Sequence, residues 1–509
     1  MSKDEKATDI NLNVETREVN DADNELLAEL GYRAEFKREF SMLETIAFAI
    51  SIMGVVASVT STFSFPLVSG GHVGMVWGWF IPCIFVMAVA LSMAELVSSM
   101  PTSAGLYYFS AKLAPPKYAA LASWITGWAN ITGQVTLVCS IDFTCAQMIT
   151  SAITVGSNGA IVLSSGATYG ILLAILFCHG LVCSAATNVL ARLNLFYVVV
   201  NGGTTVAAIV ALLVSSGNDK VSTKDAFTLF ENNTGWANNG WAFLLAFTAP
   251  MWTLTGYDSA AHISEEVAGA QRSAPIAIIA WSGYHRNIRM VTTYRSILCD
   301  KIRFFTSHHE PASANGPTLP RRTWEARHVG NLEFHHRCAG AAQGVDASRV
   351  IFAFARDNAL PGSRWWKQVN RHTQTPVNAS YHQHMYVIDV LSLTLGHLLS
   401  ACTVSYATPI FLRITSGRNA LSPGFFTLGR WYLPVGIVAV SWVAFIVVLL
   451  LFPPSQMTSA QGMNYAVVII MGVFIFASIS WVVSAHKWFH GPIKNIDTSR
   501  AASFDSKRL

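Results

Sequence analysis

The stretch VGMVWGWFIPCIFVMAVALSMA, residues 73–94, contains no charged side chain and decides the class of this protein. A helix needs roughly 20 consecutive apolar residues to cross a bilayer, and this stretch is long enough. Other stretches of the same kind precede and follow it. The complete set of predicted spans is 46–68, 73–94, 118–141, 168–190, 193–214, 241–257, 385–412, 431–452 and 463–484.

The composition of the whole chain agrees with a membrane protein. Only 12% of the 509 residues are charged, against about 25% in ordinary soluble domains, while 52% are hydrophobic. Inside a bilayer only helices and closed barrels satisfy their backbone hydrogen bonds, and the alternating pattern of barrel strands is absent from this sequence. We therefore expect an all-α polytopic membrane protein, integral to the lipid bilayer, and find no support for a nucleic-acid partner.

The basic residues indicate which ends of the spans face the cytoplasm. If the N-terminus lies inside, the inside segments are rich in Lys and Arg, whereas the predicted outer loops hold only Lys220 and Lys224. This is the distribution that the positive-inside rule describes. Both tails of the chain are therefore assigned to the cytoplasm.

Two of the predicted spans are interrupted. The first interruption, SIMGVVASVTSTFSFP (51–66), contains Gly54 and Ser58, and the second, FTAPMWTLTGYDSAAHISEE (247–266), contains Gly256 and Asp258. In transporters, interrupted helices build substrate sites because their freed N–H and C=O groups bind ions and charged solutes. Small residues in membrane helices also serve close packing, and a buried carboxylate also serves as a structural hydrogen-bond acceptor, so both interpretations stay open.

Three further acidic residues are candidates for coupling or gating. Glu95 and Glu265 lie near the predicted cytoplasmic ends of their spans, where we expect solvated or gating side chains. Asp142 closes the third span and is expected to face the outer water. All three are coupling or gating candidates, because an ionisable group near membrane depth is energetically costly and indicates a function.

Three long motifs resemble one transporter superfamily. They are MAELVSSMPTSAGLYYFSAKLAPPKYAALASWITGWANITGQ (93–134), GYDSAAHISEEVAGAQRSAP (256–275) and SRVIFAFARDNALPGSRW (348–365). In this order they are similar to the amino acid–polyamine–organocation superfamily. Within it they most resemble the fungal GABA and amino-acid permease branch, with choline permeases next.

The resemblance implies a LeuT-type fold, in which two inverted repeats place the substrate where the broken first and sixth helices face each other. By this likeness the substrate carboxylate binds backbone N–H groups near Gly54, Trp252 acts as an aromatic lid, and Asp258 receives a substrate ammonium. Gly256 marks the break of the sixth helix. The implied substrate-binding residues are Met53, Gly54, Ala57, Ser58, Trp252, Gly256 and Asp258.

The function that the resemblance implies is secondary active transport of small amino acids or GABA, and not an enzymatic activity. Proton coupling follows from the branch alone, because the span 193–214 lacks the lysine that some proton-coupled relatives carry. A choline or other quaternary-amine permease is the alternative. We expect the plasma membrane rather than the vacuolar membrane, and no cofactor or metal ion.

The segment 285–339 breaks the pattern, because it contains no predicted span and is rich in histidine and arginine. The stretch 273–284 begins like a seventh helix but is too short to cross a bilayer. The pairs of histidines in this segment match no metal-ligand spacing, although they leave a membrane metalloenzyme as an enzyme-class alternative. We interpret the segment as out-of-frame or intron-derived peptide.

A second anomaly lies at 379–404, where a ninth helix should connect two clusters of basic residues that both belong to the cytoplasmic side. We therefore expect an incomplete second repeat and a chain that does not transport as written, with a non-functional paralogue lacking helices 7–9 as a further alternative. The expected organisation is a largely disordered tail (1–43), the first repeat plus the sixth helix (44–272), a stub (273–284), the anomalous segment (285–339), the end of the eighth helix with a cytoplasmic loop (340–378), the remaining helices (379–484) and a C-terminal tail (485–509).

Overall fold

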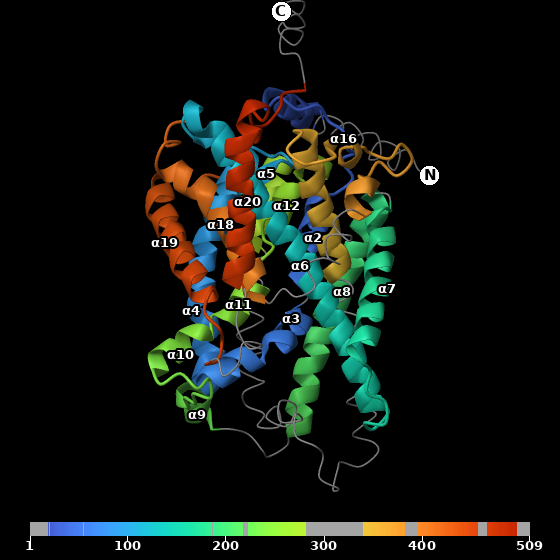
Figure 1. Cartoon of the computed structure of the whole chain (residues 1–509), viewed down its shortest axis with the longest axis vertical. Helices are drawn as coiled ribbons and strands as arrows, with labels where there is room; N and C mark the ends of the chain where they lie inside the picture. Colours follow the sequence, from blue (N-terminus) through green and yellow to red (C-terminus); the bar gives the residue numbers. More distant parts are fainter. Residues whose placement is uncertain are drawn as a thin grey trace, which may run out of the picture.

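The structure is a computed structural model that describes Val19 and residues 21–53, 55–185, 187–216, 222–280, 339–381, 395–456 and 466–495. The regular elements in these ranges are helices, and Phe40 and Val267 form an isolated bridge. Most of the long helices run along the long axis of the molecule (Figure 1). The described residues therefore form the helical bundle that the sequence predicts.

Five helices in the described ranges are long and apolar enough to cross a membrane. They are Ser64–Ser99, Pro116–Gly156, Ser165–Cys183, Val189–Ala207 and Gly429–Leu450, and the shorter apolar helices are Met42–Ile52 and Ile470–Val483. Large apolar side chains on the outer flanks of the bundle are exposed, for example Phe177 and Val482. Such a surface suits contact with lipid rather than with water.

The first predicted span is interrupted at Phe63, which lies in a turn between two helices. It consists of α2 (Met42–Met53), α3 (Val55–Thr62) and the start of α4 (Ser64–Ser99), while Gly54 between α2 and α3 lies outside the described residues. The start of α2 carries a capping box, in which Glu44 N–H donates to Ser41 Oγ and Ser41 N–H donates to Glu44 Oε2. Inside α4 the backbone leaves helical geometry at Gly71, which has φ 54°.

Five helices follow in chain order. They are α5 (Gly105–Leu113), α6 (Ala119–Gly156), α7 (Ser165–Cys183), α8 (Thr187–Ser216) and the short α9 (Thr223–Thr228). Ser164 caps α7 and Ser222 caps α9, each with its hydroxyl as acceptor for a backbone N–H, as expected of serine at this position. The long α6 packs against α5, α7, α18 and α20, so it lies at the centre of the bundle.

The second interrupted span is also divided. It contains α10 (Asn239–Leu245), α11 (Thr248–Thr253), α12 (Ser259–His262) and η2 (Ser264–Glu266), with a non-helical turn between α11 and α12. Gly256 in this turn has φ +98°, a conformation that favours glycine over any residue with a Cβ atom. A further helix covers 270–280, where the predicted stub begins.

The remaining described elements are a helix at 339–356, α16 (Ser363–Trp366), a short helix at 377–381, α18 (Leu395–Ile414), α19 (Tyr432–Leu450) and α20 (Ala466–Val483). The predicted irregular segment 285–339 lies outside the described residues apart from Ala339, and so do 382–394. The expected gap in the second repeat therefore remains a prediction.

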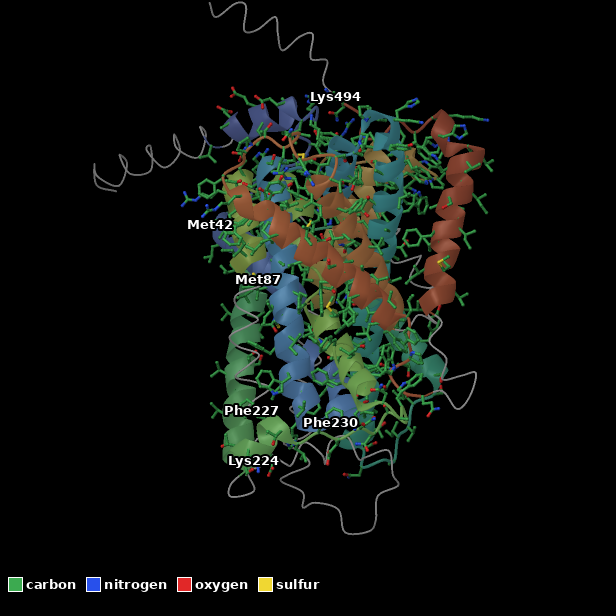
Figure 2. All side chains as sticks on the ribbon, turned by 90° about the vertical axis from the view of Figure 1, so that its left-hand side faces the viewer. Met42, Met87, Lys224, Phe227, Phe230 and Lys494 are labelled. Atoms are coloured by element: carbon green, nitrogen blue, oxygen red, sulfur yellow. The ribbon has the colours of Figure 1, made fainter. Side chains whose placement is uncertain are left out.

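Parts of both tails pack on one end of the bundle. Residues 21–41, expected to be largely disordered, contain a helix at 21–29 and bury apolar side chains such as Tyr32 and Phe40. The C-terminal segment reaches the same place, because Asn495 N–H donates to Gly31 O at 2.9 Å. The described part of the expected tail 1–43 thus packs on the bundle, and the predicted disorder of the tail as a whole remains a prediction. Lys494 marks this end, and Lys224 lies at the opposite one (Figure 2).

Candidate functional site

Asp258 is the centre of a buried polar cluster. Its side chain is fully buried in the turn between α11 and α12. The Oδ1 atom accepts a hydrogen bond from the Tyr406 hydroxyl at 2.8 Å, and Oδ2 accepts one from Gln134 Nε2 at 3.2 Å. His262, one helical turn further along the chain, places Nε2 at 3.0 Å from the same Oδ2. Three elements distant in sequence thus converge on one carboxylate.

The cluster continues onto the helix at 339–356. Gln343 donates from Nε2 to Gln134 Oε1 and also to Asp346 Oδ2, the latter at 3.4 Å. Asn130, one turn before Gln134 on α6, places Nδ2 at 3.5 Å from His262 Nε2. We define the Asp258 cluster as Asn130, Gln134, Asp258, His262, Gln343, Asp346 and Tyr406, all of which are buried.

The Asp258 cluster has hydrogen-bonding capacity that its own side chains leave unused. Asp346 Oδ1, Gln343 Oε1, Asn130 Oδ1 and His262 Nδ1 are buried and have no hydrogen-bond partner within the described part of the chain. Leaving such atoms unsatisfied in a protein interior costs roughly 1–3 kcal/mol each. A polar solute or water that enters the Asp258 cluster would recover this energy by forming the missing hydrogen bonds. The carboxylates of Asp258 and Asp346 suit a cationic group of such a solute.

The two interrupted helices meet beside this cluster. A Cβ atom on Gly256 would lie 3.0 Å from Ile52 Cγ2 and 3.9 Å from Gln343 Oε1, so the turn packs tightly against the end of α2. Trp252 is buried just before the turn. Sequence reasoning therefore placed Gly256, Trp252 and Asp258 in one region, although their roles in binding remain predictions.

The remaining predicted substrate residues lie on the first interrupted span. The carbonyl oxygen of Ser58 accepts hydrogen bonds from the hydroxyls of Ser61 and Thr62, at 3.0 Å and 2.8 Å. Gly54 lies outside the described residues, as do the side chains of Met53 and Ala57. Their predicted contact with a substrate carboxylate is therefore carried forward as a proposal.

Glu265 is buried and paired rather than solvated. Its carboxylate forms a bidentate ion pair with Arg356, with both N–O distances 3.0 Å, and Oε1 also accepts from Ser103 N–H. Burial disfavours its charge, yet the Arg356 guanidinium and these hydrogen bonds hold the pKa of Glu265 below its ordinary value. The adjacent Glu266 pairs with Arg349 at 2.7 Å. Two buried ion pairs thus tie η2 to the helix at 339–356.

Glu95 is also buried, which corrects the expectation of a solvated side chain. Its Oε2 lies 3.6 Å from Arg413 Nε, and its Oε1 accepts from Leu428 N–H at 3.3 Å. Arg413 in turn stacks on the ring of Tyr432. Glu95 therefore links the end of α4 to α18 and to the loop before α19.

Asp142 does not face the outer water, so that expectation was wrong. Its side chain is fully buried, and Oδ1 lies 3.0 Å from His179 Nδ1 on α7. Gly340 leaves the space for this pair, because a Cβ atom there would overlap Asp142 Oδ1 and lie 2.7 Å from His179 Cε1. The span ended near Asp142 in the sequence analysis, whereas α6 continues to Gly156 and carries this residue inside the bundle.

Sequence reasoning missed most partners of Asp258. The spacing of Asp258 and His262, four residues apart, was a usable signal, because side chains at i and i+4 of a helix lie on one face. The same holds for Gln343 and Asp346 at i and i+3. Nothing in the sequence indicated that Tyr406, 148 residues away, donates to Asp258.

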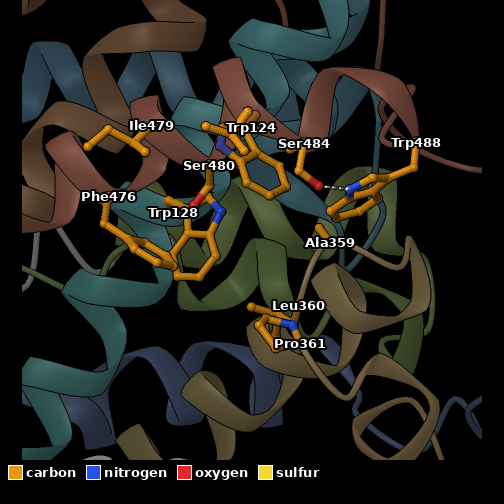
Figure 3. A pocket seen from close by; sticks show the side chains of 12 residues that line it. Trp124, Trp128, Ala359, Leu360, Pro361, Phe476, Ile479, Ser480, Ser484 and Trp488 are labelled. Atoms are coloured by element: carbon orange, nitrogen blue, oxygen red, sulfur yellow. Dashed lines mark hydrogen bonds between the residues drawn. The ribbon is translucent and has the colours of Figure 1, made fainter.

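A separate surface cavity of about 360 Å³ lies between α6, α20 and the loop at 359–361 (Figure 3). Its lining is aromatic and aliphatic, including Trp124, Trp128 and Phe476. It contains no charged side chain, and the Asp258 cluster is not part of it. It therefore does not fit a charged amino-acid-like solute. No group of three metal-ligating side chains occurs in the portion of the chain that the structure describes.

Comparison with known proteins gives the sequence relationships. The profile of the amino acid permease family matches residues 40–284 and 340–475. An uncharacterized amino-acid permease of Schizosaccharomyces pombe is 35% identical over 96% of this chain and 92% of its own length. The amino-acid permease BAT1 of Arabidopsis thaliana is 35% identical over 94% of this chain and 98% of its own, and the GABA-specific permease of Saccharomyces cerevisiae is 33% identical over 93% and 86%.

The family match bears on the two anomalous segments differently. It stops at residue 284 and resumes at residue 340, so it leaves out the residues between these positions. It then runs through 379–404, and therefore does not set that second segment apart. The relatives are named as permeases and not as enzymes.

Proposed function

The chain belongs to the amino acid permease family, and on that premise we propose that it moves small amino acids or GABA by alternating access with a proton as the coupling ion. Transport of amino-acid-like solutes as an integral membrane protein follows from the family itself. The substrate, the coupling ion, the LeuT-type arrangement and the plasma membrane as location are parts of the proposal.

One observation carries the choice of site: the buried Asp258 cluster lies where the two interrupted helices meet. Asp258 and Asp346 provide the negative charge that a substrate ammonium needs in a place without water. We place the substrate carboxylate at backbone N–H groups of the first interrupted span near Gly54, as the family resemblance implies. A small zwitterion could therefore bridge the two breaks, with Trp252 covering it.

The ion pairs of Glu265 and Glu266 suit a gate on the side where the two tails pack. Opening the bundle to that side requires η2 to separate from the helix at 339–356, which breaks both pairs. Separating the partners while a carboxylate stays buried leaves a charge without a counter-charge, which is costly, so these contacts favour the closed arrangement. We propose that substrate binding at the Asp258 cluster changes their stability.

Uptake of labelled solutes tests the proposal. Cells without their own GABA uptake would express either the full chain or a chimera whose residues 285–339 are replaced by the corresponding segment of the GABA-specific permease. We expect saturable uptake of GABA or a small amino acid by the chimera, with weak competition from choline, because a quaternary amine cannot donate hydrogen bonds to Asp258 and Asp346. Strong competition by choline would favour the quaternary-amine alternative. Absence of uptake of every amino acid by both chains would contradict the proposed function.

A further inference from the structure

We propose that the buried pair of Asp142 and His179 is the site that holds the coupling proton. This inference rests on the proposed function and deepens it, because the pair lies outside the Asp258 cluster. Asp142 comes from α6, His179 from α7, and the close approach of Gly340 adds the helix at 339–356. Three elements therefore enclose one acid and one base.

The local geometry leaves polar atoms of the pair without hydrogen-bond partners among the described residues. The two atoms Asp142 Oδ1 and His179 Nδ1 lie 3.0 Å apart, and the two side chains are 0% and 7% exposed. Neither oxygen of Asp142, nor Nδ1 of His179, has an aligned hydrogen bond within the described ranges. The buried carboxylate of Glu265 differs from that of Asp142, because it has an arginine and a backbone N–H as hydrogen-bond partners.

Among the described residues, the permanently charged side chain nearest to this region is Arg349, and it is already paired with Glu266. The titratable side chains nearby are Cys139 on α6, Cys183 on α7 and Tyr381, whose ring packs against Gly180. The Cys183 thiol donates to Ala341 O at 3.5 Å. Within the described ranges, His179 is the basic side chain that pairs with Asp142.

The proposed chemistry of the Asp142–His179 pair is the binding and release of a single proton. A proton that enters from water on one side adds to the pair and forms a new N–H or O–H bond, and it leaves as the same ion to the other side. No electron is transferred and no co-reactant is required.

The position of the pair couples it to the proposed substrate site. Asp142 follows Gln134 by two turns of α6, which is about 12 Å at 1.5 Å per residue. On the facing helix, Gly340 at the pair and Gln343 at the Asp258 cluster are one turn apart, so the same two helices line both places. A change in the charge of the pair therefore alters the packing of the helices that carry Gln134 and Gln343.

Reconstituted vesicles and purified protein test the inference in the chimera whose residues 285–339 come from the GABA-specific permease, because the chain as written is expected to accumulate no amino acid; this chimera is the parent of the variants. The variants are Asp142→Asn and His179→Gln, and the matched control is His72→Gln, because His72 is half-buried and its Nδ1 lies 3.2 Å from a backbone oxygen, that of Asp225, rather than from a carboxylate. The readouts are accumulation of labelled GABA driven by a pH gradient, exchange of labelled for unlabelled GABA at equal pH, and the pH dependence of GABA affinity in detergent. Accumulation needs the coupling proton, whereas exchange needs only the substrate site.

We expect Asp142→Asn to keep exchange within about two-fold while accumulation falls at least roughly ten-fold and the affinity stops varying with pH, since a permanently neutral amide cannot take up the proton. His179→Gln should shift the pH dependence of GABA affinity, and His72→Gln should leave it unchanged.

Accumulation or pH-dependent affinity in Asp142→Asn equal to that of the parent would overturn the proton site. Loss of exchange in a variant that still unfolds like the parent would also overturn it, because the pair would then belong to the substrate site. A parent chain that neither binds nor exchanges any amino acid would refute the proposed function itself, and the proton site with it.

Discussion

At the scale of single residues, Asp258 carries the largest expected effect on transport. We predict that Asp258→Asn lowers uptake at least roughly ten-fold, because an amide presents N–H groups to Gln134 and His262 and leaves buried donors facing donors. The variant should still reach the membrane, since Asp258 lies in a turn and supports no long helix. Uptake assays with surface labelling would check this in the chimera described above.

A matched control for this prediction is Asp225→Asn, in α9 at the end of the molecule opposite to the two tails. Asp225 is exposed near the start of α9, far in sequence from the Asp258 cluster. We expect uptake by Asp225→Asn within about two-fold of the parent, as for most exposed substitutions. Normal uptake by Asp258→Asn would remove Asp258 from the site.

The candidate site illustrates what a single sequence can supply at this scale. Asp258 and Gly256 were predicted because a carboxylate and a glycine in mid-span are costly and require a reason. Gln134 and Tyr406 were not predicted, because polar side chains are common near membrane helices and only the fold brings them to Asp258. Asp142 was misplaced because hydropathy locates the end of an apolar stretch and not the end of a helix.

At the scale of elements, the turn between α11 and α12 gives the sharpest prediction. Gly256→Ala should lower the free energy of unfolding by roughly 1–2 kcal/mol, because its φ of +98° is unfavourable for alanine and its new Cβ would press on Ile52. Thermal unfolding in detergent would measure the change. We also expect weaker substrate affinity, since the turn positions Asp258.

The control at this scale is Gly170→Ala in α7, where a Cβ atom meets nothing within 4 Å. Alanine suits a helix better than glycine by up to about 1 kcal/mol, so this change should be neutral or stabilising. Equal stability of Gly256→Ala and Gly170→Ala would show that the turn tolerates a side chain and is not the strained break proposed here.

The boundaries of the elements show where hydropathy reasoning ends. The predicted span 168–190 ran across the turn after Cys183, because Ser184 and Ala185 are no less compatible with a helix than their neighbours. The span 241–257 was predicted as one interrupted helix, yet the helix already ends at Leu245 and restarts at Thr248 before Pro250. Proline has no N–H to donate, so it is tolerated near a helix start.

At the scale of the whole molecule, the two tails meet at Asp357. This carboxylate follows the helix at 339–356 and accepts hydrogen bonds from the hydroxyls of Tyr32 and Tyr107 and from Ile493 N–H, at 3.1, 2.8 and 3.0 Å. Burial raises its pKa from 3.8 to about 6. The packing of three segments far apart in the sequence therefore depends on the protonation state of Asp357.

The sign of the pH dependence follows from this shift. Because the pKa of Asp357 is higher in the folded chain, its contribution to stability is fully present below pH 3.8 and is lost as pH rises through about 6. A shift of two units corresponds to at most roughly 3 kcal/mol. We expect hydrogen exchange of residues 485–495, corrected for intrinsic rates, to be slower at pH 5 than at pH 7.5, and Asp357→Asn to remove that difference. Tyr32→Phe is the control, since it should loosen the segment at both pH values.

The last prediction concerns residues 285–339. The family match stops at 284 and resumes at 340, and the flanking helices at 270–280 and 339–356 are both well packed against the rest of the bundle. An alternating-access transporter needs its second repeat to move against the first, and a polar segment rich in His and Arg cannot supply membrane helices there. We therefore expect that the chain as written binds amino acids weakly and accumulates none, whereas the chimera with the segment of the GABA-specific permease accumulates them. Because Glu265, Arg356 and the Asp258 cluster lie outside the exchanged segment, a gain of uptake would localise the defect to 285–339. Uptake by the chain as written equal to that of the chimera, with a spliced transcript that encodes these residues, would show instead that the segment is compatible with transport.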